Sequence, residues 1–284
     1  MPQDTNRHVG QGPDLARPPL GAERAPRLLI VAGHDSSGRA GVDADREAAL
    51  ALGARPDVVI TARTIQDEGG LRELGARAPA EWLAEARAAL ARGPRGLKLG
   101  LLPGRAQLEA AATLVAELRA LCGGRPVVFD PVVAASSGAR FLDEDALSAL
   151  RGGVLPEGLV WTPNVPEAAL LSGSDAAELA RDPSARESAA RRILALGAHA
   201  VLVTGGHAEG DPVRDLLCER ERPTRWIERP RVCGPGLGGG GCRFASALAA
   251  GLAAGRDLEP AARAAGDLVA RMLARAGSGA GRGL

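Results

Sequence analysis

The feature that most constrains the fold is a regular alternation between short apolar segments and segments with helical periodicity. The segments "RLLIVAG" (27–33), "GLKLGLL" (96–102) and "AVLVTGG" (200–206) are rich in aliphatic residues and are bounded by Gly, Pro or charged residues. Between such segments lie stretches with a 3.6-residue period, among them residues 79–93 and 185–198. This alternation is typical of βαβ units. The sequence therefore predicts an α/β fold with a central, mostly parallel sheet and helices on both faces.

Other segments fit the same alternation. Residues 214–232 differ because they alternate like an antiparallel hairpin, which we expect at an edge of the sheet. In open α/β sheets, ligands bind in the loops at the carboxyl ends of the strands, so we expect the binding site there. The further expected strands are 57–64, 126–133 and 158–164, and the further expected helices are 42–53, 106–123, 143–150, 166–173 and 242–255.

Residues 27–275 are expected to form a single domain between two flexible ends. Residues 1–26 have no periodicity and are rich in Pro, Gly and Arg, which predicts a disordered tail, and residues 276–284 are expected to form a short flexible tail. The net charge of +1 over 284 residues gives no electrostatic reason to expect nucleic acid or a membrane as partner. No apolar run approaches the roughly 20 residues of a membrane span, and the N-terminal stretch has no signal-peptide core. We therefore expect a cytoplasmic protein.

The four cysteines show no C-x-x-C spacing, so we expect free thiols rather than a zinc site or a disulfide framework. One of them, Cys242, follows six glycines between Gly234 and Gly241. A P-loop is rejected for this run, because Arg243 and Phe244 stand where lysine and a hydroxyl residue are required. A dinucleotide fingerprint is disfavoured, because helical sequence and no second strand follows.

Two interpretations of the glycine run remain open. The loop amides converge on an anion at the N-terminus of the helix over 242–255, where the helix dipole would also favour the Cys242 thiolate. Alternatively, the run is a flexible loop beside a buried cysteine without a role.

The order of the motifs along the chain helps to choose between these two interpretations. From about residue 27 to 275 the chain resembles the hydroxymethylpyrimidine/phosphomethylpyrimidine kinases of thiamine biosynthesis, in the ribokinase-like superfamily. The resemblance rests on "VAGHDSSGRAGVDAD", "DPVVAASSG", "TPNVPEAALLSG", "VLVTGGHAEGD" and "GGGGCRFASALAAGLAAG". It implies a ribokinase-like fold and transfer of a phosphoryl group from ATP, with Mg²⁺, to the hydroxymethyl group of a small-molecule pyrimidine. A second transfer, onto the monophosphate, is implied only for bifunctional members.

The same resemblance assigns roles to particular residues. Cys242 falls on the catalytic position that orients or deprotonates the attacking hydroxyl, and the amides of Gly239, Gly240 and Gly241 fall on the anion hole. The expected pyrimidine-binding residues are Gly33, Ala40, Gln66 and Leu101, the expected nucleotide and phosphate residues are Asn164, Thr204 and Gly206, and the expected Mg²⁺ residues, acting largely through water, are Asp130 and Glu167.

Plainer interpretations stand beside several of these roles. Asn164 and Glu167 also fit an ordinary helix start after Pro163, and Gln66 also fits a surface loop. Lys98, the chain's only lysine, matches the family pattern but is assigned no catalytic role.

The chain departs from the family pattern in ways that keep other functions open. Arg39 stands where the family has glycine, Thr204 and Ser136 replace lysines, and Leu237 and Gly240 replace threonines of the glycine loop. One alternative is a kinase for pyridoxal or pyridoxamine. Another, from a different class, is a catalytically weak sensor or partner protein that binds a pyrimidine or a nucleotide. A homodimer is an open alternative to a monomer.

Overall fold

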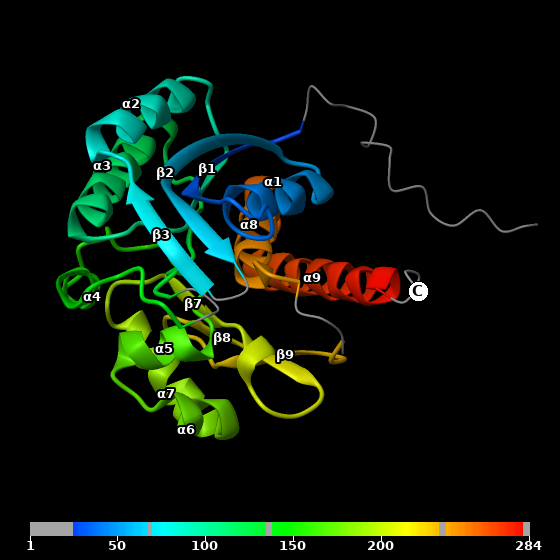
Figure 1. The fold of residues 1–284 in the computed structure, drawn as a ribbon. Coiled ribbons are helices and arrows are strands. Elements are labelled where there is room, and N and C mark those ends of the chain that lie inside the picture. Colours follow the sequence, from blue (N-terminus) through cyan, green and yellow to red (C-terminus); the bar gives the residue numbers. More distant parts are fainter. Residues whose placement is uncertain (1–24, 68–69, 135–137, 233–236, 281–284) are drawn as a thin grey trace, which may run out of the picture.

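The structure, a computed structural model, describes residues 25–67, 70–134, 138–232 and 237–280. These residues form one sheet with helices on both sides, so the predicted α/β class is confirmed (Figure 1). Across the sheet the strand order is β3 (Gly70–Ala76), β2 (Arg55–Asp67), β1 (Arg27–Asp35), β4 (Gly96–Leu99), β5 (Val127–Phe129), β6 (Val160–Trp161), β7 (Ala200–Val203), β8 (Val213–Glu219) and β9 (Arg225–Arg229).

The centre of the sheet is parallel and its two edges are antiparallel. Strands β2, β1, β4, β5, β6 and β7 all run the same way, which brings their carboxyl ends to one edge. The expected hairpin over 214–232 is confirmed, because β8 and β9 pair antiparallel beyond β7. The hairpin of β2 and β3 at the other edge was not expected. Strand β3 has little apolar alternation, since most of its side chains are exposed or half-buried.

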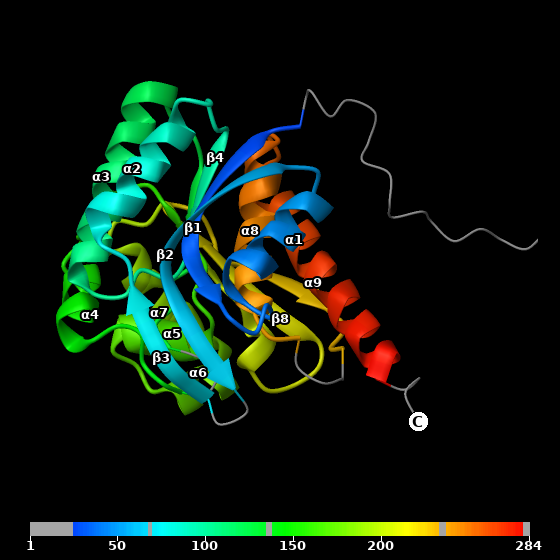
Figure 2. The same cartoon turned by 45° about the horizontal axis from the view of Figure 1, so that its top comes forward.

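The helices lie in two groups on opposite faces of the sheet (Figure 2). Alternation along the strands explains this division, because successive side chains of a strand point to opposite faces. In β1, Leu29 and Val31 belong to one buried cluster, and Leu28 and Ile30 belong to the other. The first cluster is covered by α2 (Pro79–Leu90), α3 (Arg105–Cys122), α4 (Glu144–Arg151), α5 (Val165–Ser172), α6 (Ala176–Arg181) and α7 (Pro183–Leu194), and the second by α1 (Gly41–Ala51), α8 (Gly240–Ala253) and α9 (Leu258–Ala280).

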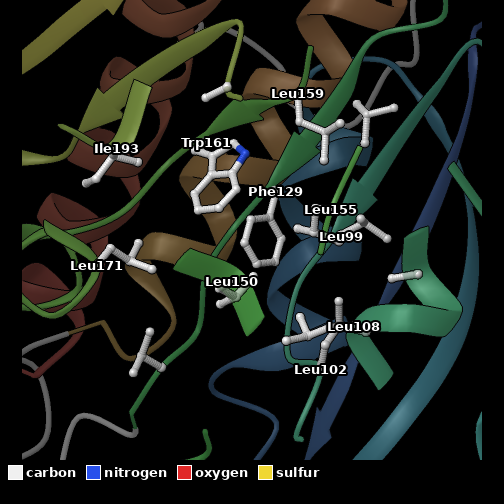
Figure 3. Packing of buried hydrophobic residues seen from close by; sticks show 14 of the residues in the cluster. Leu99, Leu102, Leu108, Phe129, Leu150, Leu155, Leu159, Trp161, Leu171 and Ile193 are labelled. Atoms are coloured by element: carbon white, nitrogen blue, oxygen red, sulfur yellow. The ribbon is translucent and has the colours of Figure 1, made fainter. Parts of the chain in front are cut away.

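An aromatic pair fixes the ends of two central strands (Figure 3). Phe129 is the last residue of β5 and Trp161 the last of β6, and their ring centroids lie 5.0 Å apart at an interplanar angle of 81°. This edge-to-face arrangement is favourable for aromatic rings. Both side chains are almost fully buried, so the residues that directly follow them, such as Asp130, start from a rigid position.

Two helical segments differ from the sequence prediction. Neither the short helix α6 nor the 23-residue helix α9 was among the expected helices, and α9 continues to Ala280, so residues 276–280 are helical where a flexible tail was predicted. The predicted tail at 1–26 falls mostly outside the described residues, which begin at residue 25. Over the described part of the chain, none of the helices combines the length and apolarity that a membrane crossing requires.

Candidate active site

The polar residues expected to form the site lie at the carboxyl edge of the parallel strands. Asp130 directly follows β5, Asn164 follows β6 after two intervening residues, and Thr204 directly follows β7. Asn164 and Thr204 form an isolated parallel bridge, in which the Thr204 N–H donates to the carbonyl oxygen of Pro163 at 2.9 Å. The topology therefore places these three residues on the edge that the sequence predicted for binding.

A pocket at this edge contains the four residues expected to bind the pyrimidine. Gly33, Ala40, Gln66 and Leu101 all line it, and Cys242 lines it as well. A side chain at Gly33 would force Leu101 to move, because its Cβ would lie 2.6 Å from Cδ2 of Leu101. The structure thus brings together residues that are up to about 200 positions apart along the chain.

The glycines before Cys242 serve two different purposes. Gly238 and Gly239 have φ values of 62° and 59°, which favour glycine, and a Cβ on Gly239 would lie 2.7 Å from Cα of Ala40. By contrast, a Cβ on Gly240 or Gly241 would meet nothing within 4 Å. Close packing against the Ala40 segment therefore requires the first pair, while the second pair leaves open space at the N-terminus of α8.

Cys242 keeps its proton, contrary to the expectation from the helix dipole. Burial raises the pKa of its thiol far above the ordinary value, and the nearby Asp130 and Asp45 carboxylates raise it further. Only Lys98 and the Gly41 backbone act in the opposite direction. Desolvation and two negative charges outweigh the partial charge at the helix start. The predicted thiolate is therefore wrong for this state, and Cys242 is a neutral thiol at pH 7.

A buried charged cluster lies beneath Cys242. Lys98 is fully buried, and its Nζ donates to Asp45 Oδ1 at 2.8 Å and to Asp45 Oδ2 at 3.0 Å. The same Nζ lies 3.6 Å from Asp130 Oδ2, and Ser246 Oγ donates to Asp45 Oδ1 at 2.7 Å. Burial disfavours the charge on Lys98, but the Asp45 and Asp130 carboxylates raise its pKa above the usual range. Burial also raises the pKa of Asp45, so the ammonium is the charge that this cluster holds most firmly.

Sequence reasoning missed Asp45 and Ser246, although a signal for each was present. Asp45 interrupts the apolar face of α1, three residues after Val42 and three before Ala48. Ser246 follows Cys242 by four residues, so both lie on one face of α8.

The comparisons with known proteins identify the family and the fold of the chain. The Phosphomethylpyrimidine kinase family matches residues 35–283. The chain belongs to this family. A hydroxymethylpyrimidine/phosphomethylpyrimidine kinase of Streptomyces coelicolor is 38% identical over 250 residues, which cover 86% of this chain and 87% of that protein. The family resemblance and the kinase class predicted from the motifs are therefore confirmed.

Solved structures agree with this assignment. A pyridoxal kinase of Bacillus subtilis, described as an ADP complex, matches with a TM-score of 0.74 and 27% identity, covering 86% of this chain and 89% of that one. A phosphomethylpyrimidine kinase of Clostridium difficile matches with a TM-score of 0.67 and 25% identity, covering 89% and 99%. The predicted ribokinase-like architecture is confirmed by these neighbours.

In this kinase, Asn164 and Glu167 form a capping box at the start of α5. Asn164 Oδ1 accepts from the Glu167 N–H, and Glu167 Oε2 accepts from the Asn164 N–H, both at 2.9 Å. The plainer interpretation of this pair, an ordinary helix start after Pro163, is thus confirmed. A nucleotide role remains compatible with it, because the cap holds both side chains at the binding edge.

Glu167 and Asp130 are two buried carboxyl groups of the kinase whose charges interact. Burial raises the pKa of Glu167 well above its ordinary value, and the Asp130 charge raises it further, against the N–H groups of Asn164 and Val133. Burial likewise raises the pKa of Asp130, while Lys98 lowers it. Asp130 Oδ2 is buried without a hydrogen-bond partner. The Lys98 ammonium lies 3.6 Å from this oxygen, and a bound cation could supply the closer partner that it lacks.

The described residues contain no group of three or more His, Cys, Asp or Glu side chains arranged to hold a metal directly.

The loop after β7 holds the remaining nucleotide candidates of the kinase. Gly205 approaches Arg214 so closely that a Cβ would lie 2.0 Å from its carbonyl oxygen, and the Gly205 N–H donates to Asp215 Oδ1 at 2.7 Å. Gly206, next along, has open space where a side chain would be. The loop is thus anchored at Gly205 and open at Gly206, beside Thr204.

The structure also places the departures from the family pattern. The Arg39 side chain packs against Gly238, since a Cβ on Gly238 would lie 3.2 Å from Cβ of Arg39. Arg39 is therefore beside the glycine loop, and its neighbour Ala40 lines the pocket. Ser136 and Cys233 lie outside the described residues, and the other three cysteines are free thiols as expected.

Proposed function

We propose that this kinase transfers the γ-phosphoryl group of ATP to the hydroxymethyl group of 4-amino-5-hydroxymethyl-2-methylpyrimidine. The observation that carries the proposal is the pocket, in which the four expected pyrimidine residues and Cys242 face the same space. The family match and the 38% identity to the Streptomyces coelicolor kinase support it. ATP as donor follows from the kinase class.

The acceptor half of the site positions the hydroxyl. Gln66 offers an amide for hydrogen bonds to the edge of the ring, while Gly33, Ala40 and Leu101 supply the apolar walls. Cys242, as a neutral thiol, orients the attacking hydroxyl by hydrogen bonding. Positioning of this kind supplies a large part of the rate in phosphoryl transfer, because the protein performs little covalent chemistry.

The donor half of the site stabilises negative charge. The amides of Gly239, Gly240 and Gly241 lie at the N-terminus of α8, where the helix dipole favours a phosphoryl group. The open space at Gly240 and Gly241 allows an anion to approach the backbone. Asn164, Thr204 and Gly206 would contact the nucleotide phosphates from the neighbouring strand ends.

Asp130 and Glu167 are the residues that would hold Mg²⁺, mainly through water. Mg²⁺ held by these residues would neutralise the negative charge that develops during phosphoryl transfer. Asp130 Oδ2 supports this assignment, because it has no hydrogen-bond partner although Lys98 Nζ lies 3.6 Å away. Asn164 supports it indirectly, because its backbone N–H holds the Glu167 carboxylate in place.

A second candidate acceptor is pyridoxal or pyridoxamine. The pyridoxal kinase of Bacillus subtilis gives a higher TM-score, 0.74, than the 0.67 of the Clostridium difficile phosphomethylpyrimidine kinase. Sequence similarity favours the pyrimidine, since the Streptomyces coelicolor enzyme is 38% identical and the Bacillus subtilis enzyme 27%.

Coupled ADP-release assays with both acceptors test the proposal. We expect the pyrimidine to give the higher kcat/KM, and we expect Cys242→Ala to lower kcat by about 100-fold, the scale on which misplacing a reacting group by about 1 Å slows a reaction. Cys242→Ser keeps a hydrogen-bonding group and should retain intermediate activity. The proposal is wrong if the unaltered protein phosphorylates both acceptors no faster than the Cys242→Ala variant does.

The proposal has three further parts: a second transfer onto the monophosphate, a cytoplasmic location and a homodimeric assembly. Product analysis by mass spectrometry with the monophosphate as acceptor tests the second transfer. Sedimentation velocity distinguishes the homodimer from the monomer, and cell fractionation tests the cytoplasmic location.

A further inference from the structure

Arg243 occupies a position in α8 that the stability of the helix alone does not favour. It lies in the first turn of the helix, directly after Cys242, and is 7% exposed. A cation near a helix N-terminus opposes the helix dipole, and a buried guanidinium also loses solvation. Its place in the structure therefore calls for specific partners.

Those partners come from two other segments of the chain. Arg243 Nη1 donates to the carbonyl oxygen of Gly238 at 2.7 Å and to that of Arg39 at 3.0 Å. Its Nε donates to Glu47 Oε2 at 2.9 Å, and its Nη2 lies 2.7 Å from the same oxygen. One side chain thus ties the glycine loop to the segment before α1 and to α1 itself.

Each carbonyl contact fixes the direction of a peptide group. In a planar trans peptide the carbonyl and the following N–H point in opposite directions. Because the Gly238 carbonyl faces Arg243, the Gly239 N–H points away from Arg243. The Arg39 carbonyl contact fixes the Arg39–Ala40 peptide in the same way, and Ala40 lines the acceptor pocket.

We propose that Arg243 is a positioning residue that sets the glycine loop at a fixed distance from the wall of the acceptor pocket. The inference rests on the proposed kinase function and adds a determinant of its geometry. Arginine suits the task, because its planar fork donates to two carbonyls and a carboxylate at once, which a lysine ammonium does not reproduce. The direct packing of Gly239 on Ala40 completes the contact that Arg243 holds together.

Steady-state kinetics on three variants test the role. Arg243→Ala should lower kcat by at least ~10-fold, since a displacement near 1 Å at a reacting centre costs up to ~100-fold, while KM for ATP changes less than kcat. Arg243→Lys keeps the charge and most of the volume, so it serves where the alanine variant fails to fold, and it should still lose several-fold in kcat. Arg263→Ala is the control, because Arg263 forms an exposed pair with Glu259, and it should leave kcat unchanged.

Chemical rescue and amide exchange separate positioning from general stability. Millimolar guanidinium chloride should restore part of the kcat of Arg243→Ala, and the same concentration of NaCl should not. Hydrogen–deuterium exchange without substrate should become faster in residues 37–41 and 237–243 of the Arg243 variants only.

Unchanged exchange overturns the proposal whether or not the protein is active. Faster exchange with unchanged kcat overturns it too, by showing a purely structural tie. Faster exchange with reduced, rescuable kcat supports it. If the unaltered protein shows no turnover, the proposed function is wrong. The hydrogen–deuterium exchange result then still tests whether Arg243 holds the glycine loop against the segment before α1.

Discussion

Cys242 combines a position at the start of a helix with surroundings that hold its proton. Burial and the carboxylates of Asp130 and Asp45 raise the pKa of the thiol far above its usual range. A raised pKa means a smaller thiolate fraction at any given pH, and only the thiolate reacts with alkylating agents. The thiol should therefore gain reactivity only as the pH rises well beyond neutrality.

Iodoacetamide labelling followed by mass spectrometry of the Cys242 peptide checks this expectation. The rate should increase about tenfold per pH unit through pH 9 and continue upward, whereas a free cysteine derivative, with a pKa near ~8.5, levels off. The shape of the profile matters more than the absolute rate, because it does not depend on access to the pocket. A plateau below pH 8.5 would show that the helix dipole dominates after all.

Lys98 should be a major determinant of stability, although it was assigned no catalytic role from the sequence. Replacing it by methionine leaves the Asp45 carboxylate buried without its cation, and such losses cost about 3–5 kcal/mol. Urea unfolding should show this decrease for Lys98→Met. Adding Asp45→Asn to the same chain should recover part of it, because Ser246 can still donate to an amide oxygen.

Arg105 provides the matched control for Lys98. It pairs with Glu109 at 2.8 Å, but both side chains are 54% exposed. Exposed pairs contribute little, so Arg105→Met should leave the unfolding midpoint almost unchanged. Equal effects of the two substitutions would mean that the buried cluster contributes no more than a surface pair.

At the scale of elements, the capping box of α5 allows the structural and functional roles of Asn164 to be separated. Asn164→Ala should lower stability by about 1 kcal/mol through loss of the cap. Asp143→Ala should cost a similar amount, because Asp143 caps α4, which also has eight residues. If Asn164 also serves the nucleotide, only its variant should lower kcat/KM for MgATP. If kcat/KM for MgATP falls equally in both variants, or in neither, then Asn164 serves only as a helix cap.

Most of the predicted elements bury more apolar surface than β3 and α6, which were missed. Helix α9 was also missed, although it buries Ala261, Ala265 and Leu268. Strands β1, β4 and β7 are nearly continuous apolar runs, which is why the sequence revealed them. Strand β3 is largely exposed at the sheet edge, and α6 has six residues with only Leu179 buried. A pattern based on hydrophobic periodicity has little to detect in such elements.

At the scale of the whole molecule, the parallel topology explains why so much of the site was predictable. Strand ends that share an edge bring Gly33, Asp130 and Asn164 together without any knowledge of side-chain packing. The charged cluster was harder to foresee, because Lys98, Asp45 and Ser246 meet only through packing of α1 and α8 against the sheet. Burial reversed the expected ionisation of Cys242 for the same reason, since desolvation depends on three-dimensional neighbours.

The two halves of the site lie on different strands, so each ligand should stabilise the fold by itself. The acceptor pocket draws on β1, β2 and α8, and the nucleotide side on the ends of β6 and β7. A ligand at 100 times its dissociation constant adds ~2.7 kcal/mol, which for a domain of this size raises Tm by roughly 5–10 °C. We expect such shifts from the pyrimidine alone and from MgADP alone, measured by scanning fluorimetry.

The same measurement on Cys242→Ala decides between an enzyme and a binding protein. The variant should keep the shift with MgADP and most of the shift with the pyrimidine, while ADP release from MgATP falls, because Cys242 acts on the hydroxyl rather than on the affinity of either ligand. If the unaltered protein shows both shifts but releases ADP no faster than the variant, the chain is a sensor or partner protein built on a kinase fold. If neither ligand shifts Tm, the pocket takes a different molecule and the assignment of Gln66 to a pyrimidine edge is wrong.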